Sequence, residues 1–206
     1  MLFLFAGTTS IVYAQSDDFT TWTNLQLKHK IDSRFAVSGG LELRTEDDMQ
    51  AIDRWGVSVG GDYKALPFLA FELGYEAHYR NLGESEWKFR HRYRIGATAS
   101  FQHQWLKVSL RERFQQTFNE GEAETRLRSR LKVAYAPQKG IVSPYFSLEI
   151  YQSLDDAPFW RAARMRYRPG IEIDLAKRWS LDAFYCYQYE SSRGKHIAGI
   201  EIKYSF

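Results

Sequence analysis

The stretch of sequence that decides the fold is Trp87–Phe101, WKFRHRYRIGATASF. Its odd positions hold mostly apolar and aromatic side chains, whereas the even positions from Lys88 to Arg94 are all basic. Successive side chains of a β-strand point to opposite faces of a sheet, so as a strand this segment has one apolar and one charged face. As a helix it would scatter the same arginines around the cylinder. The alternation therefore predicts a β-strand.

Eleven segments with this period-two alternation follow one another from Phe19 onward, among them residues 69–80, 125–135 and 163–175. The connections between them alternate in kind. One set is short and turn-like, and the other set is slightly longer and mostly acidic. This organisation predicts an all-β fold, an up-and-down antiparallel barrel of 10–12 strands with short turns at one end and acidic loops at the other.

Composition narrows the class of protein. The 206 residues are enough for one domain or two small ones, and with 16% aromatic residues the chain is too aromatic to be disordered. The single cysteine, Cys186, excludes an intrachain disulfide and a cysteine-cluster metal site. The net charge of +3 does not indicate a partner nucleic acid. We expect no cofactor and no bound metal.

The N-terminal residues are expected to direct export rather than to join the barrel. Residues 1–12 are apolar, and Val12-Tyr13-Ala14 offers a signal-peptidase site, although no basic residue precedes the apolar run. We therefore predict a signal peptide over residues 1–14, cleaved near Ala14, and a barrel over residues 15–206. The alternative is a buried N-terminal strand.

Alternation alone does not say which face of the sheet points outward. A soluble periplasmic binding barrel of lipocalin type would place the apolar face inside, whereas a transmembrane barrel places it against lipid. Eleven strands enclose more space than apolar side chains fill easily. Aromatic residues also recur near both ends of the segments, as interfacial girdles do. These observations favour a transmembrane β-barrel.

The segments Asp18–Thr23 and Leu41–Arg44, together with the alternating C-terminal end Ile200–Phe206, are similar to those of a known family. The mature chain resembles the uncharacterised outer-membrane β-barrels of Gram-negative bacteria that form a domain of unknown function. The resemblance implies an outer-membrane location and contact with membrane lipid and lipopolysaccharide. It also implies recognition of the terminal Phe206 by the barrel-assembly machinery. It implies no activity.

Two features do not fit this pattern. Bacterial single-chain barrels have an even number of strands, so we expect one of two explanations. Either a strand is miscounted, or the N-terminal segment near residues 17–22 starts inside the lumen or pairs irregularly. Pro169 lies inside a segment that otherwise alternates well. Because proline lacks an N–H donor, we expect a β-bulge there.

With the apolar face outside, the lumen holds an unusual number of charged side chains. The predicted basic cluster comprises Arg44, Arg54, Arg90, Arg92, Arg94, Arg111, Arg113, Arg126, Arg128, Arg130, Arg164, Arg166 and Arg168. The predicted lumen carboxylates are Glu42, Glu72, Glu76, Glu149, Glu172 and Glu201. Two functions are consistent with these residues. One is a narrow channel or small-ligand site that prefers anions, and the other is a structural network of ion pairs that fills the barrel.

A lipid-modifying outer-membrane enzyme is a further alternative. Its chemistry needs a nucleophile beside a base that a third group orients. His91 is the lipid-facing histidine in the middle of a strand, and a turn centred on His103 would place Glu112 diagonal to it. No serine is expected next to this pair, and the chain has no Gly-x-Ser-x-Gly motif. We therefore expect no enzymatic activity and no catalytic residue.

Overall fold

The computed structural model describes residues 18–83, 86–137, 140–155, 162–190 and 193–206. The predicted signal peptide lies outside these residues. Within them the chain forms eleven strands: β1 (Asp18–Lys30), β2 (Phe35–Glu46), β3 (Ala51–Leu66), β4 (Leu69–Asn81), β5 (Trp87–His103), β6 (Leu106–Asn119), β7 (Glu122–Tyr135), β8 (Val142–Ser153), β9 (Ala162–Ala176), β10 (Trp179–Glu190) and β11 (Arg193–Ser205). None of the described residues belongs to a helix long and apolar enough to cross a membrane.

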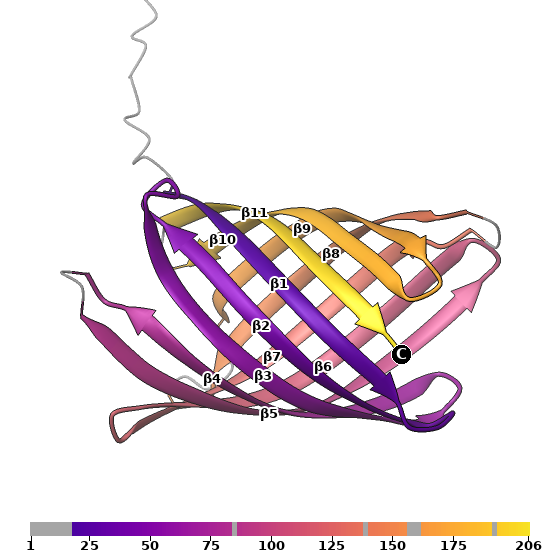
Figure 1. Ribbon diagram of the computed structural model, residues 1–206, viewed down its shortest axis with the longest axis horizontal. Helices are drawn as coiled ribbons and strands as arrows, with labels where there is room; N and C mark the ends of the chain where they lie inside the picture. Colours follow the sequence, from indigo (N-terminus) through magenta and orange to yellow (C-terminus); the bar gives the residue numbers. More distant parts are fainter. Residues whose placement is uncertain (1–17, 84–85, 138–139, 156–161, 191–192) are drawn as a thin grey trace, which may run out of the picture.

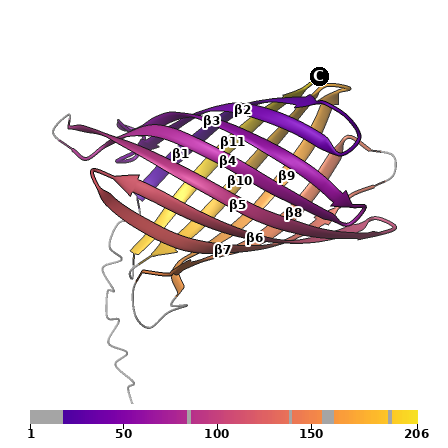
Figure 2. The ribbon, with the colours of Figure 1, turned by 90° about the horizontal axis from the view of Figure 1, so that it is seen from below.

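The eleven strands close into one barrel, which confirms the predicted fold (Figures 1 and 2). Each strand pairs antiparallel with its neighbours in sequence, and β1 closes the barrel by pairing parallel with β11, from Asp18↔Lys195 to Lys28↔Ser205. The expectation of an even number was wrong. In an up-and-down chain with an odd number of strands, the first and last strands run the same way, so only a parallel pair closes the sheet.

The two ends of the barrel differ, and we call them the turn rim and the loop rim. Short connections such as residues 31–34 form the turn rim. There the Asp32 carboxylate accepts hydrogen bonds from the Arg34 and Phe35 N–H groups, which lowers the pKa of Asp32. Phe206 ends the chain at this rim, where its N–H donates to the Lys28 carbonyl oxygen.

The first strand begins at the opposite rim. The Asp18 carboxylate accepts a hydrogen bond from the Asp48 N–H in the β2–β3 connection, at 3.2 Å. The start of β1 and the C-terminus therefore lie at opposite ends of the barrel (Figure 1). This arrangement follows directly from the odd number of strands.

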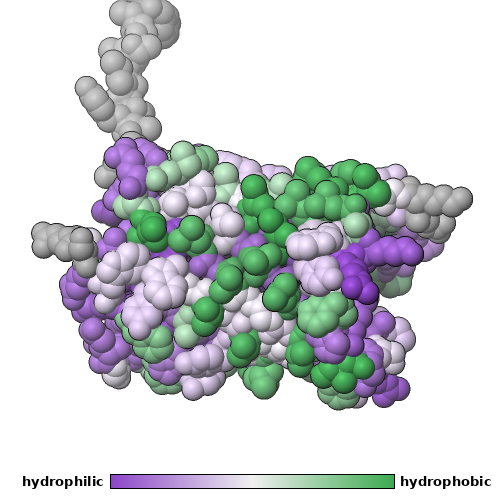
Figure 3. All heavy atoms as spheres, in the orientation of Figure 1, coloured by the Kyte–Doolittle hydropathy of each residue, from purple (hydrophilic) through white to green (hydrophobic). Residues whose placement is uncertain are grey.

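The apolar face of the sheet points outward. Large apolar side chains are exposed on the wall of the barrel, including Leu73 at 64% and Ile95 at 57% exposure. Figure 3 shows many of them across the middle of one face, with hydrophilic residues toward the ends. A lipocalin-like barrel needs the reverse arrangement, so the geometry does not support the soluble alternative.

A small apolar cluster lies inside the barrel at the closing seam. Phe184, Cys186 and Ile197 are buried, and Trp22 packs against them with its ring 6.5 Å from that of Phe184. The Phe184 ring lies directly over Gly199 of β11, where an added Cβ would overlap the ring. Side chains from β1, β10 and β11 thus interlock across the parallel pair.

Pro169 does not produce the expected bulge. It is paired with Phe146 of β8 in regular register. The ladder to β10 runs to Phe184↔Gly170 and resumes in the same register at Tyr187↔Tyr167. The missing N–H donor therefore removes pairs from the ladder locally, without adding a residue to the strand.

The close approach of Gly199 and Phe184 can be tested with two alanine substitutions. We expect Gly199→Ala to destabilise the barrel by about 1–3 kcal/mol, the usual cost of overpacking, because the Phe184 ring must move. Gly61→Ala is the control, since an added Cβ there would meet no atom nearer than 4.0 Å. The midpoint of urea-induced unfolding of the refolded protein measures both, and equal midpoints would contradict the packing described.

Candidate functional site

The lumen contains a cavity of about 410 Å³. Most of the sequence-predicted residues line it: Arg44, Arg54, Arg92, Arg94, Arg111, Arg113, Arg128, Arg130, Arg166, Arg168, Glu42, Glu72, Glu76 and Glu201. Strands β2 to β7, β9 and β11 supply these side chains. Because each strand alternates, every second residue of these strands points toward the same enclosed space.

The remaining predicted residues lie around this cavity. Arg90 donates to Asn119, Arg126 pairs with Glu124, and Arg164 forms a two-pronged hydrogen bond with Glu190. These contacts lie near the loop rim. Glu149 is buried among arginines, and Glu172 lines a second cavity near the turn rim.

Glu149 is the most enclosed carboxylate among the predicted site residues, with 2% of its surface exposed. Arg128 donates to both of its oxygens at 2.7 Å. Arg111, Arg130 and Arg166 approach the same carboxylate at 3.5, 3.6 and 3.8 Å. One negative charge is therefore shared by four guanidinium groups. This cluster fills the side of the lumen formed by β6 to β9.

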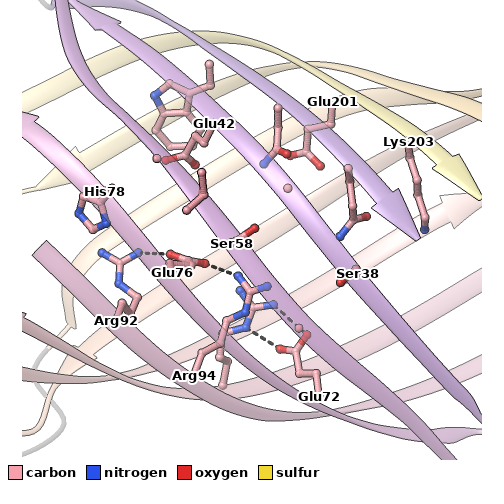
Figure 4. Close-up of a pocket in the computed structure, with 18 of the residues that line it drawn as sticks. Ser38, Glu42, Ser58, Glu72, Glu76, His78, Arg92, Arg94, Glu201 and Lys203 are labelled. Atoms are coloured by element: carbon pink, nitrogen blue, oxygen red, sulfur yellow. Dashed lines mark hydrogen bonds and ion pairs between the residues drawn. The ribbon is translucent and has the colours of Figure 1, made fainter. Parts of the chain in front are cut away.

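Other carboxylates lie between pairs of arginines on the opposite side. Glu42 is 2.7 Å from both Arg44 and Arg54. In the same way Glu76 pairs with Arg92, at 3.0 Å, and with Arg94 (Figure 4). In each group, one of the two positive charges is left without a carboxylate of its own.

Glu72 is different, because it forms a two-pronged hydrogen bond with a single arginine. Arg113 donates to its two oxygens at 2.5 and 2.9 Å. Two parallel hydrogen bonds of this kind are the geometry in which guanidinium recognises an oxyanion. The lumen thus already holds carboxylate groups in the way it would hold an oxyanion ligand.

Aromatic rings also contact the arginines. The Arg44 guanidinium lies 3.7 Å from the centre of the Trp22 ring, and that of Arg166 lies 4.6 Å from it. Arg168 lies 3.5 Å from the Phe184 ring centre. Such cation–π contacts hold the guanidinium groups in place without neutralising their charge.

Small residues explain why the cavity is open. Ser38, Gly40, Ser58 and Gly60 line it from β2 and β3. Gly74 of β4 lets the side chain of Arg94 lie flat against the wall, since an added Cβ would overlap it. These positions leave room for solute on the β1–β4 side, opposite the Glu149 cluster.

The charge lining the cavity is unbalanced. The acidic residues are Glu42, Asp62, Glu72, Glu76 and Glu201. The basic residues are Lys28, Arg44, Arg54, Arg92, Arg94, Arg111, Arg113, Arg128, Arg130, Arg166, Arg168 and Lys203. Basic groups therefore clearly outnumber acidic groups, and the cavity is electropositive.

The second cavity, of about 340 Å³, has the opposite character. Its ionisable residues are Glu172, Asp174, Asp182, Glu201 and Lys203. It shares Asn24, Gln26, Glu201 and Lys203 with the first cavity. The two cavities therefore adjoin, with a basic chamber on one side of this boundary and an acidic chamber on the other.

The sequence analysis missed several contributors to this site. Among them are the small residues of β2 and β3, the Trp22 ring, Lys28 of β1, and Lys203 at the boundary of the cavities. Lys203 is two residues after Glu201 in an alternating strand, so the alternation could have predicted that its side chain faces the lumen. The role of the small residues has no sequence signal, because a glycine in a strand does not show which cavity it leaves open.

The predicted placement of Glu112 diagonal to His91, considered for a hydrolase, is wrong, because β5 and β6 pair in a different register. His91 lies opposite Phe118, and their rings stack at 4.9 Å. Glu112 lies opposite Ala97 and accepts a hydrogen bond from the Ser129 hydroxyl at 2.6 Å. The expected turn was centred on His103, whereas the observed pair His103↔Leu106 centres it farther along the chain. His91 and Glu112 are therefore separated along the sheet.

Comparison with known proteins gives a family and a structural likeness. The family described as "Protein of unknown function (DUF2490)" matches residues 19–197. No curated protein matches the chain. Among solved structures, the translocator domain of autotransporter NalP from Neisseria meningitidis is similar at 14% sequence identity, with a TM-score of 0.49, over 82% of this chain and 73% of that chain.

The importance of Glu149 can be measured by neutralising it. We expect Glu149→Gln to destabilise the protein by about 3–5 kcal/mol, the usual cost of removing one partner from a buried ion pair. The physical reason is that four guanidinium groups would lose their shared carboxylate. Urea-induced unfolding measures the effect. Glu172→Gln is the control, because this exposed partner of Lys132 should contribute at most about 1 kcal/mol. A similar change in both variants would contradict the assignment.

Proposed function

The chain belongs to the DUF2490 family of proteins of unknown function, and we propose that it is an outer-membrane β-barrel whose electropositive lumen admits and binds small anions. The observation that carries this proposal is the combination of an apolar outer wall with a lumen in which arginines outnumber carboxylates. The membrane location rests on the outward face of the strands, and the binding of anions rests on their inward face.

The outer wall supports the membrane location. In water, a closed barrel with so many exposed aliphatic and aromatic side chains would associate through them. In a bilayer the same wall faces hydrocarbon. Each strand has at least 12 residues, which exceeds the roughly 9–11 that a tilted transmembrane strand needs.

Aromatic pairs near both rims support the same location. Phe35 stacks on Tyr63 near the turn rim, with ring centres 4.6 Å apart. Trp55 stacks on Tyr79 on the side of the loop rim, at 5.1 Å. Aromatic residues gather where hydrocarbon meets headgroups in transmembrane barrels. These pairs supply the girdles expected from the sequence.

The terminal residue supports a route of assembly. Phe206 is 54% exposed at the turn rim, and its ring lies 4.9 Å from that of His29. An exposed aromatic C-terminus is accessible to the machinery that inserts outer-membrane barrels, which is the role implied by the family resemblance. The outer wall would then contact membrane lipid, and the loop rim lipopolysaccharide.

The lumen supports a preference for anions. Rings of arginine and lysine select anions in pores, because they replace the water around the ion with fixed positive charge. The cavity is polar, and small residues keep it open. The Glu149 cluster occupies one side of the lumen and the adjoining second cavity is acidic. We therefore infer that the lumen is better suited to binding and slow passage of anions than to rapid diffusion.

A structural role is the second candidate. The ion pairs between neighbouring strands inside the lumen, such as Arg54–Glu42, Arg92–Glu76 and Arg128–Glu149, stabilise a barrel whether or not solute enters. We propose no catalytic activity, since His91 and Glu112 lie apart along the sheet and do not form the histidine–carboxylate pair that a hydrolase would need.

The anion preference can be tested in planar lipid bilayers. We expect small currents whose reversal potential in a salt gradient shows preference for anions. Ser38→Trp should abolish most of the current, because the indole would fill the cavity from its small-residue wall. Val37→Trp is the matched control, since the neighbouring side chain points outward and is 44% exposed. Folded wild-type protein that carries no current and binds no anion would favour the structural role.

The parallel seam predicts the positions of the two ends of the chain in the membrane. Eleven crossings place Asp18 on the side of the loop rim and Phe206 on the side of the turn rim. In a Cys186→Ala background, we expect a membrane-impermeant thiol reagent to label Asp18→Cys and Glu122→Cys on intact cells. Ser33→Cys and Ser205→Cys should react only after permeabilisation.

Two outcomes of this labelling are informative. Labelling of Asp18→Cys together with Ser33→Cys would contradict the parallel pair while leaving the membrane location intact. Equal labelling of all four positions on intact cells would contradict the membrane location itself.

A further inference from the structure

The cations of the lumen differ in how completely they are neutralised. Arg113 has Glu72 at 2.5 Å, Lys28 has Asp62 at 2.5 Å, and Arg168 has Asp182 at 2.6 Å. Each of these groups already has a carboxylate in close contact. A ligand would have to compete with that carboxylate, so such cations contribute little to binding.

Arg111 and Arg130 are neutralised much less. Arg166 is also 3.8 Å from Glu149, but its guanidinium donates hydrogen bonds to Gln188 and Tyr151. Arg111 and Arg130 both line the 410 Å³ cavity, and for each the one carboxylate within ion-pair distance in the described part of the chain is Glu149. That carboxylate is 3.5 and 3.6 Å away, and it is held more closely by Arg128 at 2.7 Å. The buried Nε of Arg111 also has no hydrogen-bond partner.

Lys203 lacks such a partner entirely. Within the described residues, no ion pair or hydrogen bond involves its Nζ. Its side chain lines both cavities and stands at their boundary with Asn24, Gln26 and Glu201. Glu201 lies on the same strand, as Figure 4 shows, but it is not within ion-pair distance of Lys203. A charge that is enclosed in this way is costly unless a counter-charge approaches it.

The lack of an ion-pair partner at Lys203 is not a general property of lysines on β11, as a comparison with Lys195 shows. Lys195 is another lysine of β11, an even number of residues away, and so lies on the same face. It pairs with Asp18 at 2.6 Å and lines neither cavity. One lysine of β11 is therefore neutralised at the closing seam, while the other faces open space.

We propose that Lys203, Arg111 and Arg130 form the ligand contacts of the lumen, and that the ligand is a doubly charged oxyanion of the phosphate type. This inference rests on the proposed function and assigns its residues and ligand class. The other arginines hold the barrel together through their carboxylates. These three cations have no carboxylate in close contact, so their charge is available to solute in addition to the surplus charge beside Glu42 and Glu76.

Two arguments favour an oxyanion over a halide. The planar guanidinium group presents donors in a fork that matches pairs of oxygen atoms, as the Arg113–Glu72 pair demonstrates in the same lumen. The cavity volume also falls within the range of small-molecule sites. A double charge suits a site in which several cations share one buried carboxylate.

The test is calorimetric titration of inorganic phosphate into the full chain refolded in detergent, at constant ionic strength. We expect Lys203→Gln and Arg130→Gln each to weaken phosphate binding about tenfold, the effect of losing one charged hydrogen bond. Lys203→Arg should retain binding. Lys195→Gln removes the same charge from the same strand and should leave the affinity within about twofold. Heat-modifiable gel migration verifies that each variant folds.

The outcomes separate this inference from the function on which it rests. Phosphate binding by the wild type that is unchanged in Lys203→Gln and Arg130→Gln would overturn the assignment of residues but keep the anion-binding lumen. Anion-selective currents without phosphate binding would overturn the ligand class alone. If the protein shows no currents and also no phosphate binding, both proposals are overturned.

A parallel titration with glycerol phosphate distinguishes two sources of the ligand. Tighter binding of glycerol phosphate than of inorganic phosphate would support the site with a lipid headgroup as the natural ligand. The reverse order would support the site with a free oxyanion.

Discussion

Closure of the sheet is the constraint on which the other features of this protein depend. A closed barrel gives every strand two neighbours, so no strand keeps an unpaired edge. It also divides the two faces of every strand between an outer surface and an enclosed volume. The alternating sequence then assigns apolar side chains to the outside and charged side chains to the inside. Both the membrane-compatible wall and the electropositive lumen follow from this division.

The seam between β1 and β11 is where closure is most demanding. An odd number of strands requires a parallel pair, whose hydrogen bonds are evenly spaced and slanted. Here the pair is reinforced from the inside. Trp22 packs on Phe184, and Arg44 and Arg166 both contact the Trp22 ring. An apolar cluster therefore lies inside the barrel where the two ends of the sheet join.

Enclosed charge shapes the lumen as much as side-chain volume does. Burying a guanidinium group is unfavourable without a carboxylate, so the arginines gather around Glu42, Glu76 and Glu149. This gathering leaves the opposite wall, with Ser38, Gly40 and Gly60, free of large side chains. It also concentrates surplus positive charge in the remaining space, which is why a network that stabilises the barrel is also suited to bind anions.

The sequence by itself determined the local structure and its two faces. Period-two alternation in segments such as Trp87–Phe101 is a property of neighbouring residues, and it predicted the strands, the connections at the two ends and the set of charged residues near the lumen. It did not determine register. The β5–β6 turn lies slightly farther along the chain than expected, and that shift separates His91 from Glu112. The eleven strands were counted from the sequence, but their closure through a parallel pair and the regular pairing of Pro169 were not foreseen, because pairing depends on partners distant in sequence. Only the tertiary structure decided which arginine meets which carboxylate and which of the two lysines Lys195 and Lys203 is neutralised. The physical reason is that ion pairing across a lumen depends on distances through space, which are set by closure and stagger of the whole barrel.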